Sequence, residues 1–321
     1  MSIIPTLRVL AVATVLATGS VLAQSDWPNK PIRIIVPSAA GGAADFTSRT
    51  FGRYLEAQTK QPVVIDNRAG AGGIVGTEAA KNAPGDGYTY LLSTNSTHAA
   101  NVSLFAKLPY DPQKDFEAVG MFGSFATVAM VKQGSALRSI ADVVQYARAN
   151  PGKLTFGYYS SSSQVPPELL KARTNIEMTG APYKNITQIV TDLGGGVVEF
   201  AFLDMLSAAP ALQSGRMTPI AVTAPTRLAS LPNVPAVAET IPGYEVEGWI
   251  GLTAPAGTPR AVIERMNALI AGALADPAIK GALEKQGMNP RVMRADELKT
   301  FIAADQKRWA EWVRLAKIPP Q

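Results

Sequence analysis

Two glycines, Gly41 and Gly42, stand in the stretch PSAAGGAADF (37–46), between an apolar run at 32–36 and a segment with helical spacing. Main-chain N–H groups at a helix N-terminus bind anions, because the helix contributes partial positive charge there. Glycine has no Cβ, so a ligand can approach its main chain closely. The stretch therefore predicts either an anion site or an ordinary turn, and the rest of the chain decides between them.

The residues around the glycine pair are small, which supports close approach by a ligand. We expect the main chain of Ser38, Ala39, Ala40, Gly41 and Gly42 to face the ligand. Asp45 follows at a position where it either caps the first turn of the helix or contacts a ligand, and we expect the cap.

Further candidate residues follow other expected strands, where ligands bind in open α/β sheets. The third strand (88–93) leads into STNSTH, and a later strand (154–159) leads into four serines that form either a ligand loop or a solvated loop. Asp204 follows the apolar run at 197–203, and we expect its side chain either to cap the next helix or to contact the ligand. The candidates in these segments are Ser93, Thr94, Asn95, His98, Ser160, Ser161, Ser162, Ser163 and Asp204.

Catalytic and cofactor sites find little support in the sequence. The chain has no Cys and one His, so a zinc site built on His or Cys ligands is not expected. A triad of His98 with one of the four serines remains an alternative, but G-x-S-x-G is absent. The glycines at 70–76 do not complete G-x-G-x-x-G, since position 75 is Val75, and we interpret them as close-packed backbone or a second anion loop. We expect no cofactor.

The first 23 residues indicate export. Arg8 precedes an apolar stretch, and small residues lead to Ala23, which predicts a secretory signal peptide cleaved after Ala23 rather than a membrane anchor. The formal charge of +5 comes from Lys and Arg interleaved with acidic residues, so nucleic acid is not an expected partner. The absence of Cys means that the exported chain needs no disulfide.

Strands and helices alternate twice along the chain, which predicts two α/β lobes. Long extended segments at 116–131 and 244–257 are expected to cross between the lobes, and three terminal helices to return to the first lobe. A helix is expected to start at the proline pair Pro166-Pro167. The predicted boundaries are a signal peptide (1–23), a first lobe (24–124 and 250–321) and a second lobe (125–249).

Many separate blocks resemble one known family. The chain is similar to the Bug-type receptors, the extracytoplasmic solute-binding proteins of tripartite tricarboxylate transporters, in blocks that include QPVVIDNRAGAGG, APGDGYTYLLSTNSTHAAN, LPYDPQKDF, APYKN, LPNVPAVAET and PGYEVEGWIGLTAPAGTP. The resemblance implies a type II, Venus-flytrap receptor in the periplasm, which binds a small carboxylate through its first glycine-pair loop. It also implies that the segment 93–98 faces the cleft, with His98 where the family often has His.

The chain departs from this family at three places. Ser38, Ala39 and Ala40 stand where the family usually has an aromatic residue and a proline pair, so one pocket wall is expected to be smaller and more polar. The second-lobe loop is shorter, and Asp204 is displaced by one position from the usual Phe-Asp-Asn.

We therefore expect a monomeric, non-enzymatic receptor that delivers an organic carboxylate to integral-membrane transporter subunits. A receptor that feeds a signalling partner is the main alternative, and a secreted serine hydrolase that uses His98 is a further one.

Overall fold

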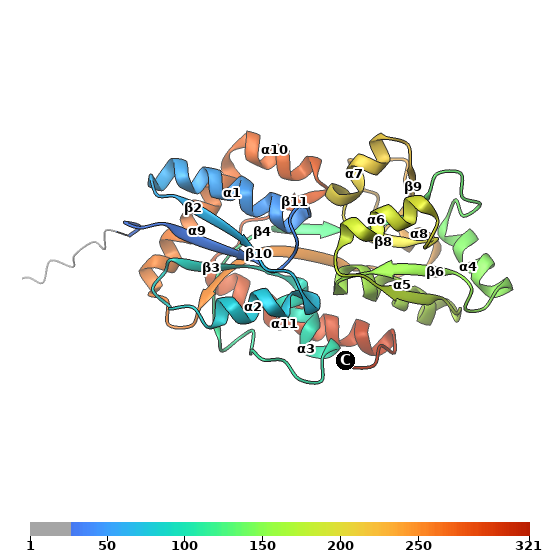
Figure 1. Ribbon diagram of the computed structural model, residues 1–321, viewed down its shortest axis with the longest axis horizontal. Coiled ribbons are helices and arrows are strands. Elements are labelled where there is room, and N and C mark those ends of the chain that lie inside the picture. The colour runs from blue at the N-terminus through green and yellow to red at the C-terminus, as the bar shows by residue number, and fades with distance from the viewer. Residues whose placement is uncertain (1–26) are drawn as a thin grey trace, which may run out of the picture.

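The computed structural model describes residues 27–321, leaving aside the side chains of Leu206 and Pro210 (Figure 1). The expected signal peptide lies outside the described residues. The elements are β1 (Ile32–Val36), α1 (Ala43–Thr59), β2 (Val63–Asn67), η1 (Ala71–Gly73), α2 (Ile74–Lys81), β3 (Thr89–Thr94), η2 (Ser96–Ala100), α3 (Asn101–Leu104), β4 (Phe116–Ala126), β5 (Val128–Lys132), α4 (Ile140–Ala149), β6 (Thr155–Tyr158), α5 (Ser161–Thr174), β7 (Thr179–Pro182), α6 (Ile186–Gly195), β8 (Ala201–Leu203), α7 (Met205–Gln213), β9 (Met217–Val222), α8 (Val237–Thr240), β10 (Glu247–Pro255), α9 (Arg260–Ala275), α10 (Pro277–Lys285), β11 (Met288–Pro290) and α11 (Ala295–Leu315).

One lobe is built on a six-stranded sheet with the order β11-β4-β10-β3-β1-β2. Strands β1, β2 and β3 run parallel, and β10 is antiparallel to both β3 and β4. Successive side chains of a strand point to opposite faces. Ile34 accordingly packs with Phe51 of α1 and Met266 of α9, whereas Ile35 packs with Ala80 of α2 on the other face. The sheet is thus covered on both sides, as the alternation in the sequence predicts.

The other lobe joins two smaller sheets, β8-β5-β9 and β6-β7. A parallel bridge between Phe156 and Phe200 connects them, and the Gly157 N–H donates to the Phe200 carbonyl at 3.1 Å. Strand β7 (TGAP) was not expected from the sequence, because it is short and half-exposed and contains Gly and Pro.

The segment expected as one strand over 116–131 is two strands, because the chain turns between them at Thr127. Strand β4 belongs to the first sheet and β5 to the second. The Thr127 N–H donates to Thr223 Oγ1 at 2.9 Å, and the Thr223 N–H donates to the Thr127 carbonyl at 2.9 Å. The Val246 N–H donates to the Thr223 carbonyl at 3.1 Å. Thr223 therefore ties together the two strand crossings between the lobes.

Helix α11 contacts both lobes, whereas the sequence predicts that it returns to the first lobe alone. Its N-terminal half packs against β4 and β10 through Leu298 and Ile302. Its C-terminal half places Trp309 and Val313 in the core cluster that also holds Leu169 of α5. The lobes are consequently joined along this side by apolar packing as well as by the two crossings (Figure 1). Within residues 27–321, no helix combines the length and apolar character needed to cross a bilayer.

Candidate functional site

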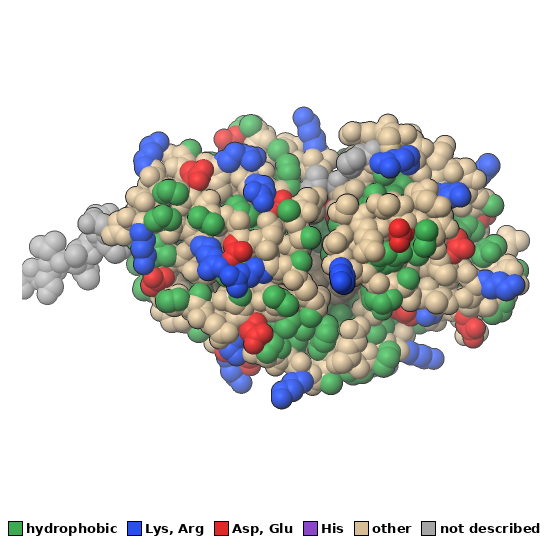
Figure 2. Space-filling view, viewed as in Figure 1, with side chains coloured by type: hydrophobic (Ala, Val, Ile, Leu, Met, Phe, Trp, Pro, Cys, Tyr) green, Lys and Arg blue, Asp and Glu red, His purple; other side chains and the backbone are tan. Residues whose placement is uncertain are grey.

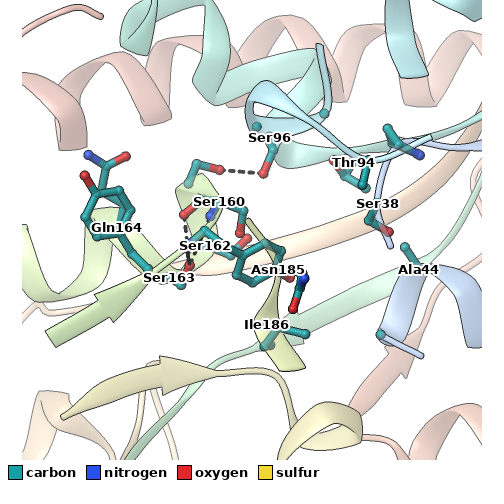
Figure 3. Close-up of a pocket in the computed structure, with 18 of the residues that line it drawn as sticks. Ser38, Ala44, Thr94, Ser96, Ser160, Ser162, Ser163, Gln164, Asn185 and Ile186 are labelled. Carbon is teal, nitrogen blue, oxygen red and sulfur yellow. Dashed lines mark hydrogen bonds between the residues drawn. The ribbon is translucent and has the colours of Figure 1, made fainter. Parts of the chain in front are cut away.

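A cavity of about 670 Å³ lies between the two lobes, beyond the carboxyl ends of β1, β2, β3 and β6. Figure 2 shows the hollow between the two halves of the molecule, and Figure 3 shows lining residues from both of them. Of the residues predicted from the sequence, the lining includes Ser38, Ala39, Ala40, Gly42, Thr94, Asn95, Ser160, Ser161, Ser162, Ser163 and Asp204. Ser93, Gly41, Asp45 and His98 do not line it.

The first wall of the cavity is the loop from β1 to α1. The side chain of Asp45 holds this loop through hydrogen bonds. Gly41 has a φ of +93°, a conformation that favours glycine, and its N–H donates to Asp45 Oδ2 at 3.0 Å. Arg49 Nε also donates to Asp45 Oδ1, at 3.0 Å. Burial opposes ionisation, but the hydrogen bonds from Arg49 and Gly41 outweigh it and hold the pKa of Asp45 below its usual value. Asp45 thus occupies the Gly41 N–H, in the loop before α1, and does not cap an N–H group of the first helical turn as predicted.

Two N–H groups in the first turn of α1 remain for a ligand. Within the described residues, the N–H groups of Ala43 and Ala44 have no hydrogen-bond acceptor, and both residues line the cavity. Ser38 Oγ is buried on the same wall and has no hydrogen-bond partner in the described part of the chain.

The opposite wall is the N-terminus of α5, which begins at Ser161 and not at Pro166 as predicted. Ser163 Oγ accepts from the N–H groups of Tyr159 at 3.0 Å and Ser160 at 3.2 Å. These bonds to the Ser163 side chain fix the helix start five residues earlier, and the proline pair lies in the second turn of α5. The N–H groups of Ser161 and Ser162 have no acceptor among the described residues and line the cavity. The expected serine loop is therefore wrong, but the expected second helix N-terminus is present.

Direct hydrogen bonds join the two walls at a clasp formed by Asn95, Ser96, Ser161 and Ser162. Asn95 Nδ2 donates to Ser161 Oγ at 3.2 Å and to Ser162 Oγ at 3.1 Å. The hydroxyls of Ser96 and Ser161 lie 2.7 Å apart (Figure 3). Asn95 Oδ1 also accepts from the Trp249 N–H of β10 at 3.4 Å. The clasp thus connects the end of β3 to the start of α5 across the bottom of the cleft.

His98 lies behind the cavity wall, because the segment expected as a loop is the helical turn η2. Its ring is fully buried against Phe116 and Trp249, with centroid distances of 5.1 and 6.5 Å. Nδ1 lies 3.0 Å from Thr97 Oγ1, and burial lowers the pKa of His98 to about 3. A buried neutral imidazole whose hydrogen bond goes to Thr97 is not arranged as the base for any of the four serines.

Asp204 lines the cavity and also caps α7. Its Oδ1 accepts from the Ser207 N–H at 2.9 Å, and its Oδ2 accepts from Ser207 Oγ at 3.1 Å. The predicted cap on the next helix is therefore observed for Asp204, and the predicted ligand contact stays a prediction.

Sequence reasoning missed the segment 182–187, which adds Lys184 and the helix cap Asn185 to the lining. Asn185 Oδ1 accepts from the Gln188 N–H at 3.0 Å. The cap was recognisable in NITQ, but the strand before it, β7, was not predicted. Without that strand, nothing in the sequence indicated that this segment lies at the ligand edge of a sheet.

Comparisons with known proteins agree with this architecture. The family model of the tripartite tricarboxylate transporter family receptor (TctC) matches residues 48–317. The chain belongs to this receptor family. Protein BugT of Bordetella pertussis is 34% identical over 315 residues, which cover 96% of this chain and 97% of BugT.

Two solved TctC-like structures share the fold. An R. palustris protein solved with adipate has a TM-score of 0.89 and 30% identity, covering 92% of this receptor and 100% of that chain. MatC of Rhodopseudomonas palustris, solved with bound malate, has a TM-score of 0.82 and 26% identity, covering 89% of this receptor and 100% of MatC. The predicted two-lobed binding-protein fold and the predicted family are thereby confirmed.

Proposed function

We propose that this receptor binds an organic carboxylate in the cavity and delivers it to the membrane subunits of a tripartite transporter. The observation that carries the proposal is the pair of helix N-termini that meet at the cavity. Ala43 and Ala44 line it from one lobe and Ser161 and Ser162 from the other, and the N–H groups of these four residues have no acceptor among the described residues. We call these four N–H groups the cradle.

The cradle suits a carboxylate for electrostatic reasons. The N-termini of α1 and α5 each contribute partial positive charge, and free N–H groups donate hydrogen bonds to anionic oxygens. Adipate and malate in the two related structures are carboxylates, which supports the same ligand class here. Lys184 lines the same cavity and adds one full positive charge.

Export and the lobe boundaries belong to the same proposal. The signal peptide over 1–23 would place the mature receptor in the periplasm. We propose that the receptor acts there as a monomer. The first lobe would comprise 24–124 and 250–321, and the second lobe 125–249.

A thermal-shift series that pairs each carboxylic acid with its amide tests the proposal. The amide keeps the shape of the acid but removes the charge that the cradle recognises. A ligand that binds only the folded receptor stabilises it by about 2.7 kcal/mol at a hundredfold excess over its Kd. We expect at least one acid to raise the melting temperature saturably while its amide does not. If no acid does so, or if acid and amide act equally, carboxylate binding is refuted.

Delivery requires a separate measurement. Carboxylate uptake into vesicles that contain the transporter subunits should depend on added receptor. Ligand binding without any stimulation of uptake would favour the sensor alternative.

A further inference from the structure

We infer that the ligand is a monocarboxylate with a bulky apolar body, such as an aromatic ring or a chain of six or more carbons, rather than a small dicarboxylate or a tricarboxylate. This inference rests on the proposed carboxylate-binding function and narrows its substrate class. Three features of the cavity carry it: its size, its apolar lining and its charge.

The cavity is large for a small acid. Its volume of about 670 Å³ corresponds to roughly 20 water molecules, at about 30 Å³ of liquid volume for each. An acid of three or four carbons held at the cradle would leave most of this space to water. A ring or a long chain would displace that water from the apolar walls, which is favourable.

The walls outside the cradle are mostly apolar and come from both lobes. Phe105 and Phe125 line the cavity on the side of the six-stranded sheet, where Phe125 belongs to β4, and Tyr158, Tyr159 and Ile186 line it on the other side. Ligand pockets lined in this way take their binding energy from apolar contact and use a few polar groups for orientation.

The α1 side of the cavity is open because its side chains are small. Ala40 and Ala44 line the cavity there, and Ala44 lies opposite Asn185 and Ile186 in Figure 3. An apolar body that leaves the cradle therefore has room between α1 and the segment before α6.

The charges of the lining favour a single carboxylate. Among the side chains of the described lining residues, that of Lys184 is the one cation and that of Asp204 the one acid, and no arginine is present. Lys184 is exposed, so solvent screens its attraction. Asp204 is only 8% exposed, and a second or third ligand carboxylate near it would meet like charge in a poorly solvated place. A polyanion therefore gains little from this lining beyond the cradle.

Isothermal titration of the whole protein with two sets of acids tests the inference. Benzoate, phenylacetate and octanoate represent bulky monocarboxylates, and acetate, malate and citrate represent small or polyanionic acids. We expect at least one bulky acid to bind about tenfold or more tightly than every member of the second set. Tighter binding of malate or citrate would overturn the inference but leave the proposed function intact. If neither set binds, the proposed function fails and the inference fails with it.

Cavity-filling variants supply the matched controls. Ala44→Leu adds volume at the cavity, whereas Ala57→Leu makes the same change at an exposed position of the same helix. Ala44→Leu should weaken binding of the bulky acid by about tenfold relative to Ala57→Leu, because the filled space no longer accepts its body. Ala40→Leu, at an exposed loop position of the lining, should do the same if Ala44→Leu does not fold. Unchanged binding of the bulky acid in a folded cavity-filling variant would overturn the inference.

Discussion

Removal of the Asn95 side chain is expected to weaken the connection between the lobes. Asn95 is 1% exposed and its amide serves Ser161, Ser162 and the Trp249 N–H. Each hydrogen bond contributes about 1 kcal/mol net, and a buried donor left without a partner costs about 1–3 kcal/mol. Asn95→Ala should therefore lower the free energy of unfolding by roughly 3 kcal/mol, since three hydrogen bonds of about 1 kcal/mol each are lost, although Ser161 keeps its hydrogen bond to Ser96.

Urea denaturation with a double-mutant cycle separates the clasp from a general packing defect. Asn95→Ala and Ser162→Ala should show a coupling energy of about 1 kcal/mol, because each change removes the partner of the other. The matched control combines Asn95→Ala with Ser139→Ala, which removes a cap on α4 that has no bond to the clasp. That pair should add within about 0.5 kcal/mol. Coupling with Ser162 no larger than with Ser139 would refute the assignment of the clasp.

Three further predictions concern the scaffold of the site. Ser139→Ala alone should cost about 1 kcal/mol in urea denaturation through loss of the α4 cap, whereas Ser139→Asp should cost little. Because the pKa of Asp45 is lowered on folding, its contribution to stability is present above the ordinary value of 3.8 and is lost as the pH falls through the folded value. Asp45→Asn should accordingly flatten the loss of stability between neutral and acid pH, and an unchanged profile would contradict this account. A Cβ at Gly248 would lie 2.5 Å from the Phe125 ring, so Gly248→Ala should cost about 1–3 kcal/mol. Gly281→Ala on α10, where a Cβ meets nothing within 4 Å, should not destabilise the protein. Thermal denaturation of the two variants side by side measures the difference.

Elements with a clear local signal were predictable from the sequence. Strand β1 occupies 32–36 as expected, because its apolar residues are bracketed by Pro31 and Pro37. Helix α4 begins after Ser139, where the sequence offers both a serine cap and helical spacing of the apolar residues. The residues that start such elements and the regular spacing of their apolar residues are both present within the segment itself.

The elements that the sequence did not reveal depend on contacts from elsewhere in the chain. Strand β7 forms by pairing with β6, and its own residues have little strand preference. The start of α5 depends on which of four consecutive serines folds back onto the main chain, and composition does not distinguish them. The break at Thr127 reflects its bonds with Thr223, which lies 96 residues further along the chain.

The same division applies to the candidate site. The segments that follow strands β1, β3 and β6 were found because the fold class determines where ligands bind, although two of them are helical and not loops. The inward orientation of His98 was not predictable, because it depends on η2 forming a helical turn where a loop was expected. The exact N–H groups that remain free at α1 also could not be deduced, because they depend on Asp45 reaching Gly41.

Helix α11 has a mechanical consequence for how the receptor admits its ligand. Exposing Trp309, Val313 and Ile318 would cost about 1.5–3 kcal/mol for each side chain. Opening is therefore least costly when the lobes rotate about an axis that runs along α11, because this rotation keeps the three side chains buried. The gap then widens on the opposite side, where α1 faces α7 (Figure 1). Opening on that side would widen the cavity while the packing of α11 stays intact.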